Sequence, residues 1–268
     1  MTQPLFSVAL NTLTRTLADD DLRLVAASKI QCLEVAARMF DNDLGDGRKS
    51  AVKAMARQGG PRVYSLHAGD LDLSALHHGV HARAIGEAVE TIELAKELGA
   101  AQIVFHPSDD RIEPSIRPYR IAQSIDAFKA LAPEARRCGV KIAIEALPRT
   151  CLCNTADELS RILEPLPTDV VGVCIDTNHL MANYRSLCDT IVRFKDRLLE
   201  IHCSDYDGID ERHALPGTGV VDWSGVMQTL RGIGFDGPLN YEVVFRTAPP
   251  LDERIKTLEE NYRWLSSL

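Results

Sequence analysis

Residues 170–202, VVGVCIDTNHLMANYRSLCDTIVRFKDRLLEIH, contain the pattern that determines the fold. The apolar run at 170–176 predicts a buried strand, 186–197 predicts a helix, and 198–202 predicts a second buried strand. A strand, a helix and a strand in this order form a unit whose strands are parallel and whose helix covers them. The stretch therefore predicts an α/β protein built on a parallel sheet.

The same alternation continues on both sides of this unit, over the whole 268-residue chain. The other predicted strands are 5–11, 32–37, 62–68, 102–106, 140–146 and 239–244, and the other predicted helices are 19–29, 50–57, 79–98, 118–138, 154–164, 223–232 and 250–268. Eight such units in about 250 residues close naturally into a barrel. We therefore predict a single (β/α)8 TIM-barrel domain over 1–268. The alternative, an open doubly wound sheet, needs a glycine-rich turn after the first strand, and NTLTRTL at 11–17 is not one.

Composition and charge limit the class of protein. The net charge is −8, whereas nucleic-acid binders normally carry a basic surface, so we expect a small-molecule substrate rather than a nucleic acid. The seven cysteines are scattered and odd in number, which favours reduced thiols and a cytoplasmic protein. The N-terminus lacks the pattern of a signal peptide, and no apolar run reaches the ~18 residues that would cross a membrane.

Four ionisable residues lie at or near the ends of four successive predicted strands. They are Glu145, Asp176, His202 and Glu242. The C-terminal ends of barrel strands meet at one rim, where barrel enzymes place their chemistry. Buried carboxylates are costly unless they are paired or bind a cation, and this set lacks basic partners for a network of salt bridges. We therefore predict that these residues bind one divalent cation, Mn²⁺, Mg²⁺, Co²⁺ or Zn²⁺.

Further histidines lie near the same rim. His67 and His106 end the third and fourth strands, and His179 follows Asp176 by three residues. We expect His67 and His106 to line the substrate side of the site or to hold a second metal. A lone histidine more often has no role in a site. We therefore expect three histidines at the start of the third helix to be solvated: His77, His78 and His81.

Residues 198–223, LLEIHCSDYDGIDERHALPGTGVVDW, form one wall of the predicted site. His202 is the one metal ligand expected there, and the DERH segment at 210–213 is expected to bind substrate. Three acids in residues 198–223 are expected to be solvated or to cap local turns: Asp205, Asp207 and Asp210.

Several motifs resemble those of the xylose isomerase-like TIM barrels, a superfamily of sugar and sugar-phosphate isomerases and epimerases that also contains the type IV AP endonucleases. The resemblance covers essentially the whole chain. The motifs are IEALPRTCLCNT (144–155), VGVCIDTNH (171–179), HCSDYDGIDERHALPGTGVVDW (202–223) and GPLNYEVV (237–244).

This resemblance implies a metal-dependent isomerase or epimerase that moves a proton through a metal-stabilised enediolate. In the ketose 3-epimerases the ligands match Glu145, Asp176, His202 and Glu242, and the two glutamates also act as the acid/base pair. His179 stands where a histidine binds substrate oxygens, and His213 would polarise a hydroxyl. Relatives of this kind are often dimers or tetramers, so a homo-oligomer is expected.

One position departs from the epimerase pattern. Those enzymes use an arginine six residues after the metal histidine, where this chain has Gly208, so the role would pass to Arg212. A phosphorylated sugar would also need a basic clamp, for which the candidates are Arg149, Arg212 and Arg246.

Three other activities remain open. The same enediolate could expel a leaving group, which gives a dehydratase or lyase acting on a keto-sugar, cyclitol or keto-glycoside. The endonuclease branch binds three zinc ions, and its ligands also have counterparts here, but it has Asp where this chain has Glu211, and a glycine-rich loop where this chain has ALPRTCLCNT. The last possibility is a sugar-binding barrel without catalysis, against which the pair of carboxylates argues.

Overall fold

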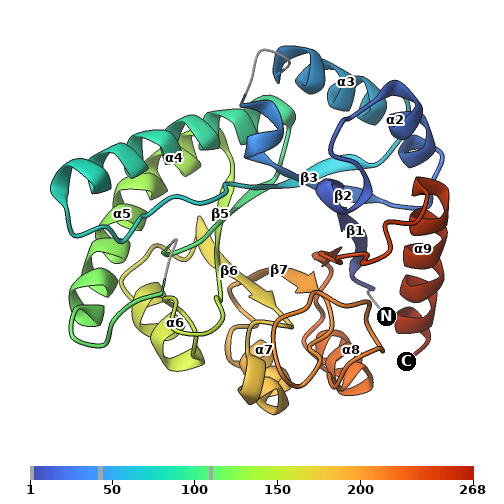
Figure 1. Cartoon of the computed structure of the whole chain (residues 1–268). Coiled ribbons are helices and arrows are strands. Elements are labelled where there is room, and N and C mark those ends of the chain that lie inside the picture. Colours follow the sequence, from blue (N-terminus) through green and yellow to red (C-terminus); the bar gives the residue numbers. More distant parts are fainter. Residues whose placement is uncertain (1–2, 42–44, 109–110) are drawn as a thin grey trace.

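The apolar runs of the sequence form the strands of a closed parallel barrel, surrounded by helices (Figure 1). The computed structural model describes residues 3–41, 45–108 and 111–268. Each strand pairs in parallel with the next one along the chain, and β8 pairs with β1, which confirms the predicted TIM barrel. The eight strands are β1 Leu5–Ala9, β2 Cys32–Ala36, β3 Arg62–His67, β4 Gln102–Phe105, β5 Lys141–Glu145, β6 Val171–Asp176, β7 Leu198–Cys203 and β8 Pro238–Tyr241.

Helices of very different length connect the strands. The two longest, α4 and α5, pack side by side beside β3, β4 and β5. The helical segments are α1 Leu10–Leu13, α2 Asp19–Ala26, η1 Ala37–Phe40, α3 Gly45–Arg57, α4 His78–Leu98, α5 Arg117–Cys138, α6 Ala156–Leu163, η2 Met181–Ser186, α7 Leu187–Arg193, α8 Trp223–Gly232 and α9 Leu251–Ser267. No helix among the described residues is long and apolar enough to cross a membrane.

Local sequence signals explain where several helices begin and end. Gly99 and Gly139 follow α4 and α5 with φ of 77° and 71°, the left-handed conformation that glycine adopts without strain. The Thr155 side chain accepts a hydrogen bond from the Glu158 amide at the start of α6, and Asp222 does the same for the Gly225 amide at the start of α8.

The interior of the barrel contains a polar layer below its mouth. Ser65 Oγ and Gln102 Nε2 donate to the Glu200 carboxylate over 2.9 and 2.6 Å, and Asn240 Nδ2 donates to Glu34 Oε1 over 3.0 Å. These bonds join strands that are not neighbours in the barrel, so they cross its interior. The apolar core lies mainly between the outer faces of the strands and the helices.

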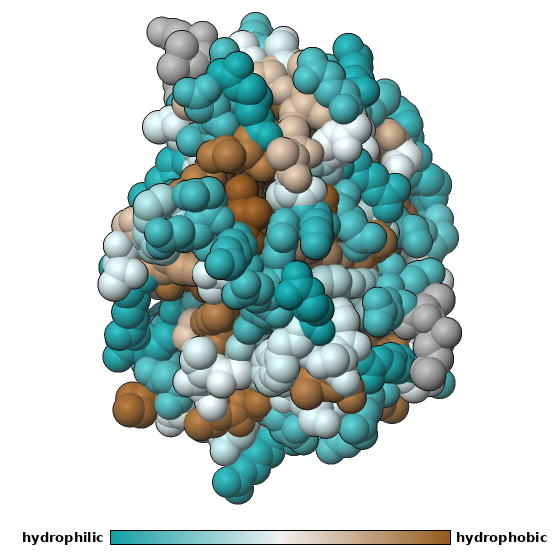
Figure 2. All heavy atoms as spheres, turned by 90° about the vertical axis from the view of Figure 1, so that its right-hand side faces the viewer, coloured by the Kyte–Doolittle hydropathy of each residue, from teal (hydrophilic) through white to brown (hydrophobic). Residues whose placement is uncertain are grey.

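Some predictions about element ends and surfaces were wrong. The first strand ends at Ala9, because residues 10–13 turn into a short helix, and β8 ends at Tyr241, so Glu242 lies just beyond its strand. His81 is not solvated: its side chain is buried, and its Nε2 lies 3.0 Å from the Gln123 carbonyl oxygen. Figure 2 shows the face that includes α9, where hydrophobic residues lie in several separate groups among hydrophilic ones.

Candidate active site

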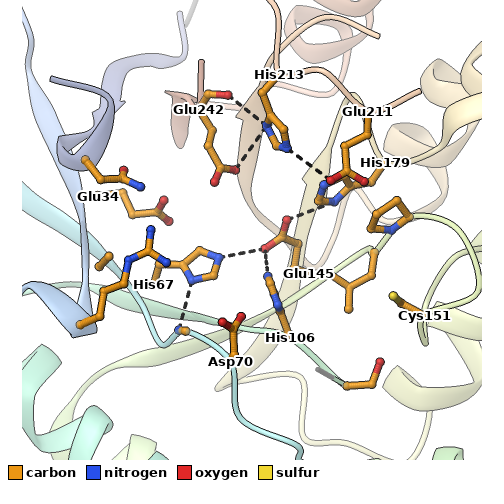
Figure 3. Close-up of a pocket in the computed structure, with 17 residues that line it drawn as sticks. Glu34, His67, Asp70, His106, Glu145, Cys151, His179, Glu211, His213 and Glu242 are labelled. Atoms are coloured by element: carbon orange, nitrogen blue, oxygen red, sulfur yellow. Dashed lines mark hydrogen bonds and ion pairs between the residues drawn. The ribbon is translucent and has the colours of Figure 1, made fainter. Parts of the chain in front are cut away.

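Most of the predicted site residues meet at the C-terminal mouth of the barrel. Glu145, Asp176 and His67 are the last residues of β5, β6 and β3, and His106 and Glu242 directly follow β4 and β8. Because parallel strands of a barrel all end at the same rim, residues far apart in sequence gather there. Figure 3 shows several of these side chains pointing toward one another across one hollow, called here the mouth cavity.

Four side chains form the predicted metal group. One ligand atom from each of Glu145, Asp176, His202 and Glu242 lies within 4.8 Å of every other. His202 Nδ1 lies 3.4 Å from Glu145 Oε1 and 3.2 Å from Glu242 Oε2. Three of the four are buried, whereas the Glu242 side chain is 27% exposed and lines the mouth cavity.

Two orphaned atoms indicate that this group fits a cation. His202 Nδ1 and Asp176 Oδ2 are fully buried, and neither makes a hydrogen bond with another described residue, although ionisable groups lie 3.2–3.5 Å from each atom. A buried polar atom without a partner costs about 1–3 kcal/mol, and burial also raises the pKa of Asp176. A divalent cation would satisfy both atoms, and three carboxylates with one imidazole suit Mn²⁺, Mg²⁺, Co²⁺ or Zn²⁺.

Besides His202, three histidines surround the Glu145 carboxylate (Figure 3). Glu145 Oε2 lies 3.3 Å from His67 Nε2 and 3.2 Å from His106 Nε2, and Glu145 Oε1 lies 3.3 Å from His179 Nδ1. Three further groups among the described residues could each hold a metal ion: His67, His106 and Glu145; Asp176, His179 and His213; and the buried Glu34, Glu200 and His202. The predicted second-metal position at His67 and His106 therefore has a suitable third ligand in Glu145.

The pKa values of these groups shift in opposite directions. Burial alone would raise the pKa of Glu145, but the nearby imidazoles, led by His202, lower it well below its ordinary value. Burial opposes charge on His67 and His179 as well. The hydrogen bond with Glu145 and the charge of Glu34 nevertheless raise the pKa of His67 to about 9, and Asp176 and Glu145 raise that of His179 to about 10. Without a cation, the site therefore holds a carboxylate among protonated imidazoles.

Two side chains of the DERH segment line the mouth cavity, and the other two do not. Glu211 and His213 line the mouth cavity, and His213 Nδ1 lies 3.1 Å from the Glu242 carbonyl oxygen. Arg212 points elsewhere: its Nε lies 3.0 Å from Asp207 Oδ2, and it is not among the lining residues. Arg149 Nη1 lies 2.6 Å from Glu211 Oε2, so this arginine is also occupied by an acid. The structure therefore brings His213 to the site but not Arg212.

Asp205 and Asp207 have structural roles. Asp207 caps a turn, as expected, by accepting hydrogen bonds from the Ile209 and Asp210 amides. Asp205 is not solvated: it is fully buried and accepts hydrogen bonds from the Gly217 and Val221 amides and from Trp223 Nε1.

Sequence reasoning missed Glu34 on β2 and Glu200 on β7. Glu34 Oε2 lies 3.1 Å from His202 Nε2, on the side of the ring opposite the metal group, and Glu34 also lines the mouth cavity. Burial and the charge of Glu34 raise the pKa of Glu200 to about 8. The available signal was a single acid inside each of two apolar runs, CLEVAA at 32–37 and LLEIH at 198–202.

Fold and site together define an α/β barrel with a carboxylate and histidine centre at its C-terminal rim. Residues 22–268 match the family model described as xylose isomerase-like TIM barrel, so the chain belongs to this family. It is 25% identical over 142 residues to D-psicose 3-epimerase of Enterocloster bolteae, covering 52% of this chain and 45% of the relative. It is 27% identical over 172 residues to inosose isomerase of Bacillus licheniformis, covering 61% of each. The matches span about half to three fifths of these curated relatives.

Solved structures share the fold over nearly the whole chain. The 3-keto-D-glucoside 4-epimerase of E. coli superposes with a TM-score of 0.81 at 17% identity, covering 98% of this chain and all of that chain. A D-psicose 3-epimerase determined in the presence of D-fructose superposes with a TM-score of 0.79 at 20% identity, covering 97% and 96%. At these identities the likeness shows the common fold.

Proposed function

We propose that the protein is a divalent-metal-dependent isomerase or epimerase of a sugar or sugar phosphate, with Glu145 and Glu242 as its acid/base pair. The observation that carries the proposal is the position of these two carboxylates. Glu145 ends β5 and Glu242 directly follows β8, an oxygen of each lies within 3.4 Å of His202 Nδ1, and both residues line the mouth cavity. A general base and a general acid must each reach the substrate carbon that they serve, and both carboxylates share one cavity.

The side chains divide the work of a proton transfer beside a carbonyl. One glutamate takes the proton from carbon and the other returns a proton, so that use of opposite faces gives epimerisation and transfer to an adjacent carbon gives isomerisation. His179 and His213 would hold substrate hydroxyls, and His67 and His106 would contact the substrate from the other side. A divalent cation bound by Glu145, Asp176, His202 and Glu242 would supply positive charge that stabilises the negative oxygens of the deprotonated substrate.

The names of the relatives support this reaction class. Matches include enzymes named D-psicose 3-epimerase, ketose 3-epimerase, L-ribulose 3-epimerase and inosose isomerase. Each of these names denotes the epimerisation or isomerisation of a carbonyl-bearing sugar or cyclitol. The same chemistry fits the pair of carboxylates in this chain.

Proton NMR in D₂O tests the proposal directly. Manganese-loaded protein is incubated with a panel of ketoses and inososes, manganese is removed, and deuterium at carbon and new sugars are measured. We expect exchange with an intact carbon skeleton for at least one substrate, and a fall of about 10²–10⁴-fold in Glu145→Gln and Glu242→Gln. Glu134→Gln, on α5 beside Arg137, is the matched control and should retain wild-type exchange.

Other outcomes of the same experiment identify the alternatives. Loss of water or of an aglycone would show a dehydratase or lyase, and sugar binding without exchange would show a binding protein. Cleavage of an abasic-site DNA duplex by zinc-loaded protein would show an endonuclease. Any of these results without ketose exchange would overturn the isomerase assignment.

A further inference from the structure

A groove lined by arginines runs outward from the mouth cavity. It is bounded by the segments that follow β1, β2 and β8, and it is called here the arginine groove. Glu242, His213 and Arg38 belong to both hollows, so the groove is continuous with the candidate active site. Its cationic residues are Arg15, Arg38 and Arg254.

Two of these arginines have no acidic partner in the described part of the chain. Arg15 and Arg38 are exposed, and no ion pair or hydrogen bond joins either guanidinium to another described residue. Both also line a smaller hollow with Arg48, whose Nη1 donates to the Met39 carbonyl oxygen over 2.8 Å. Several positive charges therefore converge on one side of the mouth in a protein whose net charge is −8.

The remaining polar groups of the groove do not cancel this charge. Arg254 Nη1 donates to the Thr12 carbonyl oxygen over 3.0 Å, while its buried Nε has no partner among the described residues. Asp21 is the acid of the groove besides Glu242, and its Oδ2 already accepts hydrogen bonds from the Thr14 and Thr16 hydroxyls. Unpaired guanidiniums beside one another repel, and an anion bound between them relieves that repulsion.

The arginines predicted from the sequence to bind a phosphate do not line the arginine groove. Arg149 pairs with Asp210 and Glu211, and Arg212 pairs with Asp207. Arg246 is exposed and lines neither hollow. The segments after β1 and β2, rather than those after β5, β7 and β8, therefore offer free positive charge to a substrate.

We propose that Arg15 and Arg38 form an anion subsite that binds a phosphate or carboxylate group at the end of the substrate remote from its reacting carbonyl. The inference rests on the proposed function, because it places the carbonyl at the metal group and the anionic end in the arginine groove. Guanidinium groups bind both kinds of oxyanion through charge-assisted hydrogen bonds. The substrate class is then a ketose phosphate or a keto-uronate rather than a neutral sugar.

Matched probes test the subsite. D-fructose, D-fructose 6-phosphate and D-fructuronate differ at the end remote from the carbonyl, and their dissociation constants are measured by calorimetry on manganese-loaded protein. We expect at least one anionic probe to bind wild-type protein at least tenfold more tightly than D-fructose. That ratio should fall at least tenfold in the Arg15→Gln/Arg38→Gln double variant and stay at the wild-type value in Arg83→Gln, which alters an exposed arginine of α4. Which anionic probe shows the gain tells phosphate from carboxylate.

The outcomes separate this inference from the proposed function. If no probe binds better than D-fructose, or if the double variant keeps the wild-type ratio, the subsite is refuted even when ketoses exchange deuterium. If the ratio behaves as expected but no ketose or ketose phosphate exchanges deuterium, the isomerase assignment fails and the anion subsite stands.

Discussion

His202 Nε2 lies 3.1 Å from Glu34 Oε2, and this contact fixes which nitrogen of the ring can bind a metal. Because the carboxylate accepts a hydrogen bond from Nε2–H, the lone pair is left on Nδ1, which faces Glu145 and Glu242. If His202 binds a metal as proposed, Glu34 holds its ring in the position that this binding requires.

Replacing Glu34 should weaken metal binding. We expect Glu34→Gln to raise the dissociation constant for Mn²⁺ by about 10–100-fold. A neutral amide orients the imidazole less well than a carboxylate and does not increase its basicity. Competition with a chelator of known affinity measures the effect without any assay of turnover. Glu134→Gln serves as the control. Equal Mn²⁺ affinities of Glu34→Gln and wild type would show that the contact has no role in metal binding.

Metal binding should release protons. In the metal-free protein the pKa of His67 is raised to about 9 and that of His179 to about 10, so both are protonated at pH 7. A cation next to Glu145 repels these charges, so the protons leave as it binds. We expect the apparent affinity for Mn²⁺ to rise as pH increases from 6.5 to 8, by about tenfold per unit for each proton released. Calorimetry in two buffers of different ionisation enthalpy counts the protons, and identical heats in both buffers would refute the idea.

Glu200 should make the metal-free protein less stable as pH rises. Its pKa is raised from 4.5 to about 8, so between these values the folded state holds a proton that the unfolded state has lost. The free energy of unfolding therefore decreases with pH in this window, by up to about 1.4 kcal/mol per unit. Glu200→Gln removes the titrating group, so its stability should decrease less steeply. Urea unfolding at pH 5.5 and 7.5 measures both slopes, and parallel curves for variant and wild type would contradict the pKa shift.

The fold and the gathering of four ionisable residues at the rim could be predicted because both follow from local patterns. Alternating apolar runs and helical spacing give the order of elements, and barrel closure then brings every strand end to one rim. Position at or near the end of a strand was enough to predict that four residues lie together: Glu145, Asp176, His202 and Glu242. The distance between them in sequence did not matter.

The polar layer and the arginines could not be predicted in the same way. Glu34 and His202 meet across the barrel interior although 168 positions separate them, and no spacing rule connects them. The partners of loop arginines depend on loop backbone geometry. Arg149 and His213 adopt φ of 56° and 46°, left-handed conformations that the sequence gives no reason to expect at non-glycine residues. These turns direct Arg149 toward Glu211 and His213 toward the cavity.

Arg117 of α5 should stabilise the loop after β5 and, with it, the folded protein. This guanidinium donates to both Glu158 carboxylate oxygens and to the carbonyl oxygens of Thr150 and Cys151, and the two ionic side chains are only 19% and 10% exposed. Arg117→Met leaves the Glu158 charge and the two carbonyls without this donor, so we expect a loss of about 3 kcal/mol in the free energy of unfolding. Arg136→Met is the matched control, because its ion pair with Asp169 is 50% and 60% exposed and should contribute little. Urea unfolding compares the two variants, and equal midpoints would mean that the Arg117 network does not stabilise the fold.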